Sequence, residues 1–157
     1  MASEKYHKEA ENLIKAIDIA IEIFRNHSPK EWYEHKVGDI NQVEHTIKCY
    51  KDMKQQRINA EAKYQNLASL KYCVEDVFIY FQEASGETVN EFWKKIKEAN
   101  LPYERENKMG KILKRKKIRN DIEYDYVIDT IVPLEQEGVL TKEDVELLNQ
   151  MIGQYEQ

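Results

Sequence analysis

No glycine or proline occurs between Asp39 and Ala84, and this feature most restricts how the chain folds. The whole chain has five glycines and three prolines in 157 residues. Because these residues supply most tight turns, the chain has few positions for β-hairpins. Apolar residues recur at three- and four-residue steps in this stretch, which is typical of amphipathic helices. They form two stripes, Ile40, Val43, Ile47, Tyr50 and Met53, then Leu67, Leu70, Val74, Val77, Phe78 and Phe81.

The polar stretch 54–65 separates these stripes and leaves two interpretations. Either residues 39–84 form one helix of about 45 residues, or two helices meet at a break near Asn59 or Asn66. We favour the single helix because no breaker is present. Such a helix would span roughly 65–70 Å, more than a compact domain of this size. Its protruding face predicts self-association.

The first and last helices have clear capping signals. Ser3 is expected to cap a helix that runs to about Asn26, and Thr141 to cap the final helix with Asp144 at its third position. Ser85-Gly86 is expected to end the long helix.

Residues 88–131 are expected to hold two further helices. Thr88 and Glu91 match a capping box for a short helix, and a second helix begins within 103–111 and continues to about 131. Pro133 then begins a short element that Gly138 closes. We therefore predict an all-α fold, an up-and-down bundle of four to six helices with one or two long helices, in a single domain over 1–157.

The composition restricts the class of protein. Charged residues make up 34% and apolar residues 41%, which fits neither a disordered nor a membrane protein. No apolar run reaches the roughly 20 residues of a membrane span, and the first residues lack the apolar segment of a secretory signal. Cys49 and Cys73 have no CxxC spacing, which indicates thiols in a reducing compartment. We predict a soluble, cytoplasmic protein without a membrane partner.

A basic segment interrupts this acidic chain, whose net charge is −5. Six of the nine residues in 111–119 are cations, and Asp121, Glu123 and Asp125 follow directly. On one helix these cations would lie on a common face that neutralises phosphates, which predicts nucleic-acid binding. The alternative is a solvated face whose cations pair with nearby acids. The candidate nucleic-acid-binding residues are Lys111, Lys114, Arg115, Lys117 and Arg119.

The end of this segment resembles the signature of the HEPN superfamily (higher eukaryotes and prokaryotes nucleotide-binding domain). Ribonucleases of this superfamily are helical bundles with an arginine, a polar residue and, a few residues later, a histidine. In one toxin branch asparagine follows the arginine, and a tyrosine stands at the second residue after the histidine. Arg119, Asn120 and Tyr126 match those positions, but Tyr124 occupies the place of the histidine. The resemblance therefore implies a member that binds without cleaving.

The histidines support no catalytic or metal site. No histidine follows His45, and a tyrosine with an ordinary pKa of about 10 is a poor general base near neutral pH. Glu4 and His7 have the ExxH spacing of di-iron bundles, but no second such pair exists. We predict a non-enzymatic protein with no catalytic residues, cofactor or metal. It would act through protein–protein contact, as a homo-oligomer or with another protein; the alternative is the HEPN-like nucleic-acid-binding protein.

Overall fold

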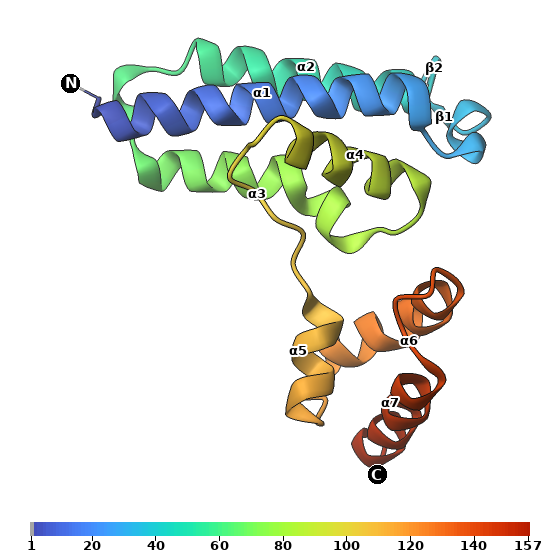
Figure 1. Ribbon diagram of the computed structural model, residues 1–157. Helices are drawn as coiled ribbons and strands as arrows, with labels where there is room; N and C mark the ends of the chain where they lie inside the picture. Colours follow the sequence, from blue (N-terminus) through green and yellow to red (C-terminus); the bar gives the residue numbers. More distant parts are fainter. Residues whose placement is uncertain (1) are drawn as a thin grey trace. The chain divides into compact units, whose positions relative to one another are not determined.

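The computed structural model describes residues 2–157 and is mostly helical (Figure 1). Seven α-helices lie in this range, and its only strands are two residues long each. The predicted all-α class is confirmed. The number of helices exceeds the expected four to six because two segments expected to be continuous are divided. Within residues 2–157, no helix combines the length and apolar character needed to cross a membrane.

The chain divides into two compact units. The first ends at Arg105, and the second covers Glu106–Gln157. We expected one domain over 1–157, whereas each unit has a hydrophobic cluster of its own. The two units are therefore described separately.

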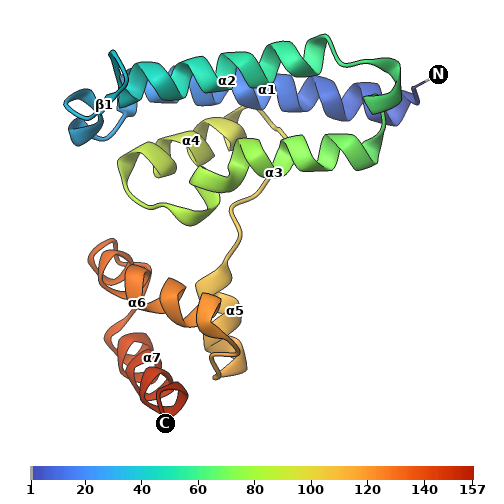
Figure 2. The same ribbon diagram turned by 180° about the vertical axis from the view of Figure 1, so that it is seen from behind.

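The first unit is organised around α1 (Glu4–His27), which packs against the three other helices of that unit (Figures 1 and 2). Ser3 caps it as predicted, because its side chain accepts a hydrogen bond from the Tyr6 amide at 3.0 Å. The apolar stripe of α1 is buried along its whole length, as its helical spacing requires. Its most deeply buried members are Leu13, Ala16, Ile17, Ala20, Ile23 and Phe24.

A short hairpin follows α1. A 3-10 turn, η1 (Lys30–Tyr33), places Trp32 against Phe24 with ring centroids 5.8 Å apart. Strands β1 (Lys36–Val37) and β2 (Ile40–Asn41) then pair antiparallel. Their turn uses Gly38 at φ +66°, a conformation that favours glycine.

The prediction of one continuous helix over 39–84 is wrong. The chain forms α2 (Gln42–Ile58), a 3-10 turn η2 (Ala62–Tyr64) and α3 (Leu67–Glu83). Asn66 caps α3 by accepting a hydrogen bond from the Ser69 amide at 2.9 Å. The break lets both apolar stripes fold onto α1, so no helix longer than the core remains to explain self-association.

The fourth helix, α4 (Glu87–Glu98), completes this unit. Gly86, at φ +104°, is its N-cap residue, so the predicted capping box at Thr88 and Glu91 is wrong. Thr88 is buried, and its hydroxyl donates to the His27 carbonyl at the end of α1. This long-range partner replaces the local cap.

The second unit contains α5 (Lys108–Arg115), α6 (Asp121–Gln136) and α7 (Lys142–Tyr155). Thr141 and Asp144 form the predicted capping box of α7. Gly138, at φ +78°, follows the end of α6, but Pro133 lies inside that helix instead of beginning a new element. The buried cluster comprises Met109, Ile112, Ile118, Val127, Leu134, Leu140, Leu148 and Met151.

Candidate functional site

The structure divides the basic segment between two local environments. Lys111, Lys114 and Arg115 lie on α5, which ends at Arg115, whereas Lys117 and Arg119 lie in the connection to α6. The expected continuous helix to 131, with one cationic face, is therefore wrong. Lys116 takes the left-handed conformation at φ 62°, which ends α5. Burial of Ile118 in the cluster anchors the connection.

Glu123 on α6 forms ion pairs with two of the candidate cations. Arg115 donates from Nη1 to Oε1 at 2.7 Å and from Nη2 to Oε2 at 3.2 Å, a bidentate pair. Arg119 donates its backbone amide to Oε1 at 2.9 Å and its Nη2 to Oε2 at 3.2 Å. The Glu123 amide in turn donates to Asn120 Oδ1 at 2.9 Å, so the Asn120 side chain caps the start of α6.

These contacts change the acidity of Glu123. The hydrogen bond from Arg115 is the largest cause, and it lowers the pKa of the carboxyl to about 2. The bonds from Arg119 act in the same direction, against the effect of burial. The Glu123 side chain is 15% exposed and the Arg115 side chain 29% exposed. Arg115 therefore serves the structure of this unit and is not among the residues available to a phosphate.

The remaining lysines of the segment are available to a ligand. Lys111, Lys114, Lys116 and Lys117 are all exposed. None of the four has an ion pair in the part of the chain that the structure describes. Arg119 holds Glu123, but its side chain remains 61% exposed. The surface that can attract an anion is thus mainly lysine.

The residues that match the HEPN signature have structural partners here. Arg119 bonds Glu123, and Asn120 caps α6. Tyr124, at the histidine position, stacks on Tyr155 with ring centroids 5.1 Å apart. The Tyr126 ring has Lys108 Nζ 5.9 Å from its centroid.

The two stacked tyrosines are weak bases at neutral pH. Desolvation raises the pKa of Tyr124, and the nearby Glu156 raises it further. The hydrogen bond from the Tyr155 hydroxyl to Asp121 is the largest cause that raises the pKa of Tyr155 to about 12. A protonated phenol donates a hydrogen bond and is not a proton acceptor, unlike the neutral imidazole of a histidine.

A second exposed surface lies on α3 and was not predicted from the sequence. Tyr72 is 70% exposed and Ile79 is 56% exposed, although large apolar side chains are more often buried. Their seven-residue spacing places them on one side of the helix, and exposed Glu75 and Asp76 lie between them. We refer to Tyr72, Glu75, Asp76 and Ile79 as the α3 outer face. The apolar stripe predicted for α3 forms the buried side of this helix. The seven-residue spacing of Tyr72 and Ile79 is the sequence signal that could have predicted the outer face.

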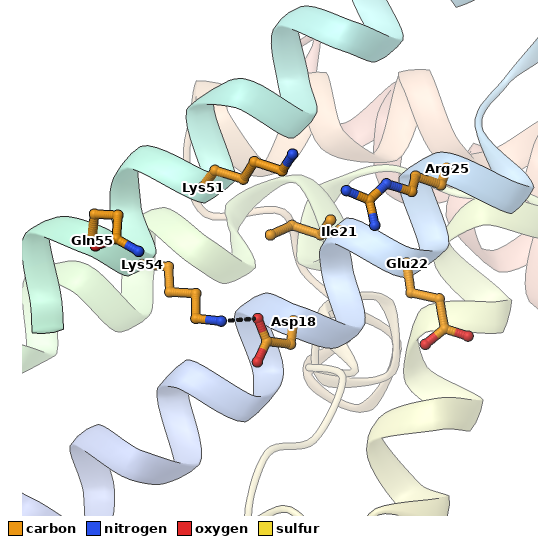
Figure 3. Close-up of a pocket in the computed structure, with 7 residues that line it drawn as sticks. All are labelled: Asp18, Ile21, Glu22, Arg25, Lys51, Lys54 and Gln55. Carbon is orange, nitrogen blue, oxygen red and sulfur yellow. Dashed lines mark ion pairs between the residues drawn. The ribbon is translucent and has the colours of Figure 1, made fainter.

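A polar groove of about 580 Å³ lies between α1 and α2 (Figure 3). Lys54 pairs with Asp18 at 2.8 Å, while Arg25 and Lys51 extend over Ile21. Arg25 and Lys51 are both exposed, and the exposed carboxylate of Glu22 also lines the groove. The groove therefore lacks the buried, converging polar groups of a specific ligand site.

Within residues 2–157, no three His, Cys, Asp or Glu side chains are grouped so that they could hold a metal ion. Comparisons with protein-family models, with curated proteins and with solved structures return no match for this chain.

Proposed function

We propose that this protein acts without catalysis, through protein–protein contact, and that its partner is a second copy of the same chain. The α3 outer face carries the proposal. It exposes an aromatic and a branched apolar side chain, Tyr72 and Ile79, around which Glu75 and Asp76 add negative charge. Exposed aromatic residues are enriched at protein interfaces.

Charge complementarity favours a second copy as the partner. The α3 outer face is acidic, whereas Lys111 and Lys114 lie on α5 without carboxylate partners in the described residues. Opposite charges on two surfaces of one chain attract the corresponding surfaces of another copy. Two such contacts related by a two-fold axis give a closed dimer, and one contact repeated from copy to copy gives a ring or an open assembly. The proposal includes a cytoplasmic location, supported by the two free cysteines.

Light scattering coupled to gel filtration tests this proposal. A monomer has a mass of 18.7 kDa. We expect a larger mass at high micromolar concentration that falls toward the monomer as salt is added, because screening weakens the charged contact. A monomeric mass under all of these conditions would contradict the proposal.

A charge exchange identifies the surfaces. Glu75→Lys/Asp76→Lys and Lys111→Glu/Lys114→Glu should each be monomeric alone. An equimolar mixture of the two variants should associate again, because the basic α3 face of the first meets the acidic α5 of the second. Glu135→Lys on α6 is the matched control, since this exposed residue belongs to neither surface. Failure of the mixture to associate would exclude this pair of surfaces.

Nucleic-acid binding is the second candidate, and the four exposed lysines without ion pairs favour it. In this proposal the chain resembles the HEPN superfamily as a member that binds RNA without cleaving it. Changing Lys111, Lys114 and Lys117 to Glu should abolish RNA binding, with the salt slope falling by about one per lost phosphate contact. Arg115 is left unchanged because it holds Glu123. If RNA binds neither the unaltered chain nor the variant, nucleic-acid binding is excluded as the function.

A further inference from the structure

Arg57, near the end of α2, is a buried cation without an anionic partner. Arg57 as a whole residue is 8% exposed. Nη1 donates to the Tyr6 hydroxyl at 3.0 Å and to the Tyr64 carbonyl at 3.2 Å, and Nη2 contacts Cys73 Sγ at 2.7 Å. The third donor, Nε, is buried and has no partner. One guanidinium thus connects α1, η2 and α3 through neutral groups.

This arrangement leaves a positive charge to be balanced. No carboxylate of residues 2–157 forms an ion pair with Arg57. Burial is the largest single effect on the pKa of Arg57 and lowers it, but hydrogen bonds and charge interactions with Tyr6 and Cys73 together leave this pKa raised, so the guanidinium keeps its charge. Burying a charge without a counter-ion is costly. Among the three acceptor groups, Cys73 is the one that carries a nucleophilic sulfur.

A small cavity lies beside the sulfur. Its volume is about 50 Å³, and its lining includes Cys73, Arg57, Met53, Gln56 and Asp76. A water molecule needs roughly 10–15 Å³ of such space, so a molecule of the size of hydrogen peroxide has room to enter. Cys73 is half-buried and on the wall of this cavity. Asp76 is the carboxylate on the same wall, and its charge opposes that of a thiolate.

We propose that Cys73 is a site of reversible oxidation by hydrogen peroxide and that Arg57 activates its sulfur. The thiolate attacks one peroxide oxygen, so that a sulfur–oxygen bond forms as the oxygen–oxygen bond breaks. Sulfur loses two electrons, and the second oxygen leaves as hydroxide and takes a proton from solvent to become water. The product is a sulfenic acid, which a thiol can reduce. Its oxygen supplies an acceptor beside the guanidinium, whose Nε otherwise has none.

Cys49 provides an internal comparison. Its sulfur lies 3.6 Å from His45 Nε2 on the same helix, and both residues are half-buried. An imidazole carries a positive charge only when protonated, whereas a guanidinium is always charged near neutral pH. The two thiols therefore differ in their neighbouring charge more than in their exposure.

Oxidation of the reduced, full-length protein tests the proposal. Hydrogen peroxide is added with dimedone, which traps sulfenic acids, and mass spectrometry measures labelling at each cysteine. We expect Cys73 to react about tenfold faster than Cys49, since one charge-assisted hydrogen bond is sufficient for such a factor. Arg57→Met should remove this advantage and leave the Cys49 rate unchanged. Equal rates in the unaltered chain, or an unchanged Cys73 rate in a folded Arg57→Met variant, would overturn the proposal.

A second variant avoids any loss of folding at Arg57. Asp76→Asn removes an exposed negative charge from the cavity wall and should increase the Cys73 rate. Circular dichroism of both variants establishes that they are folded, and iodoacetamide labelling in denaturant should give equal rates for the two cysteines. An Asp76→Asn rate equal to or below that of the unaltered chain would also overturn the electrostatic account.

Discussion

Arg57 in the first unit and Glu123 in the second are both largely enclosed charges, yet their partners differ in kind. Glu123 is held by two arginines, four and eight residues before it in the chain. Arg57 is held by a phenol, a carbonyl and a thiol, and the most distant of these residues lies 51 positions away. A carboxylate with two cationic donors gains strong charge-assisted bonds. A guanidinium with neutral acceptors gains less for the same loss of hydration. Glu123 therefore stabilises its unit, whereas Arg57 is the charge to which we assign the activation of Cys73.

Removing Glu123 should have the largest effect on stability. We expect Glu123→Ala to lower the free energy of unfolding of the second unit by about 2–3 kcal/mol, because the partly enclosed Arg115 loses its counter-ion and the exposed Arg119 loses its hydrogen bonds. Chemical denaturation followed by hydrogen exchange of residues 106–157 measures this change. Glu135→Ala, an exposed change on the same helix, should stay within about 0.5 kcal/mol. Similar losses in the two variants would show that the Glu123 contacts contribute little.

Acid should weaken the same contacts over a defined range of pH. Hydrogen bonding to Arg115 holds the pKa of Glu123 at about 2, against an ordinary value of 4.5. Because the folded pKa is the lower one, this stabilisation is complete above about pH 4.5 and is lost as the pH falls toward 2. The unaltered chain should therefore lose stability more steeply in this range than Glu123→Gln, which has no carboxyl at this position. Denaturant titrations at several pH values measure the difference, and parallel curves would contradict it.

Replacing Arg57 by methionine should have the smallest effect. In Arg57→Met, the loss of hydrogen bonds is offset by removal of a buried cation, so the stability of the first unit should change by less than about 1 kcal/mol. Fluorescence of Trp32 and Trp93, both in this unit, follows its unfolding in urea. Arg57→Ala also removes the packing of the side-chain stem and should cost about 2–3 kcal/mol. A loss in Arg57→Met as large as in Glu123→Ala would remove the contrast between the two charges.

The basic segment shows how far local patterns predict a site. Its cations, and the acids that follow them, are visible in the sequence, and pairing with nearby acids is one of the two interpretations that the sequence allows. An i,i+4 pair of Arg119 with Glu123 is one that the sequence allows, but the pairing of Arg115 with the same carboxylate was not predictable, because it depends on where α5 ends. Lys116 ends that helix in the left-handed conformation, and only then does Arg115 face Glu123. Of the exposed lysines, Lys111 and Lys114 lie on α5 itself, and Lys116 and Lys117 lie in the turn that follows it.

The amino-acid sequence by itself determined the helical class, the extent of α1, and the caps at Ser3 and Thr141. These features depend on contacts within a few residues, which spacing and side-chain chemistry specify directly. The break between α2 and α3, the long-range role of Thr88, the division into two units and the burial of Arg57 were decided by tertiary structure. Each of them satisfies a polar or apolar group with a partner distant in the chain, as Thr88 does with His27 and Arg57 with Tyr6. A polar stretch such as 54–65 is compatible with a continuous helix locally, and it breaks because two apolar stripes are buried better against α1 than along one extended helix.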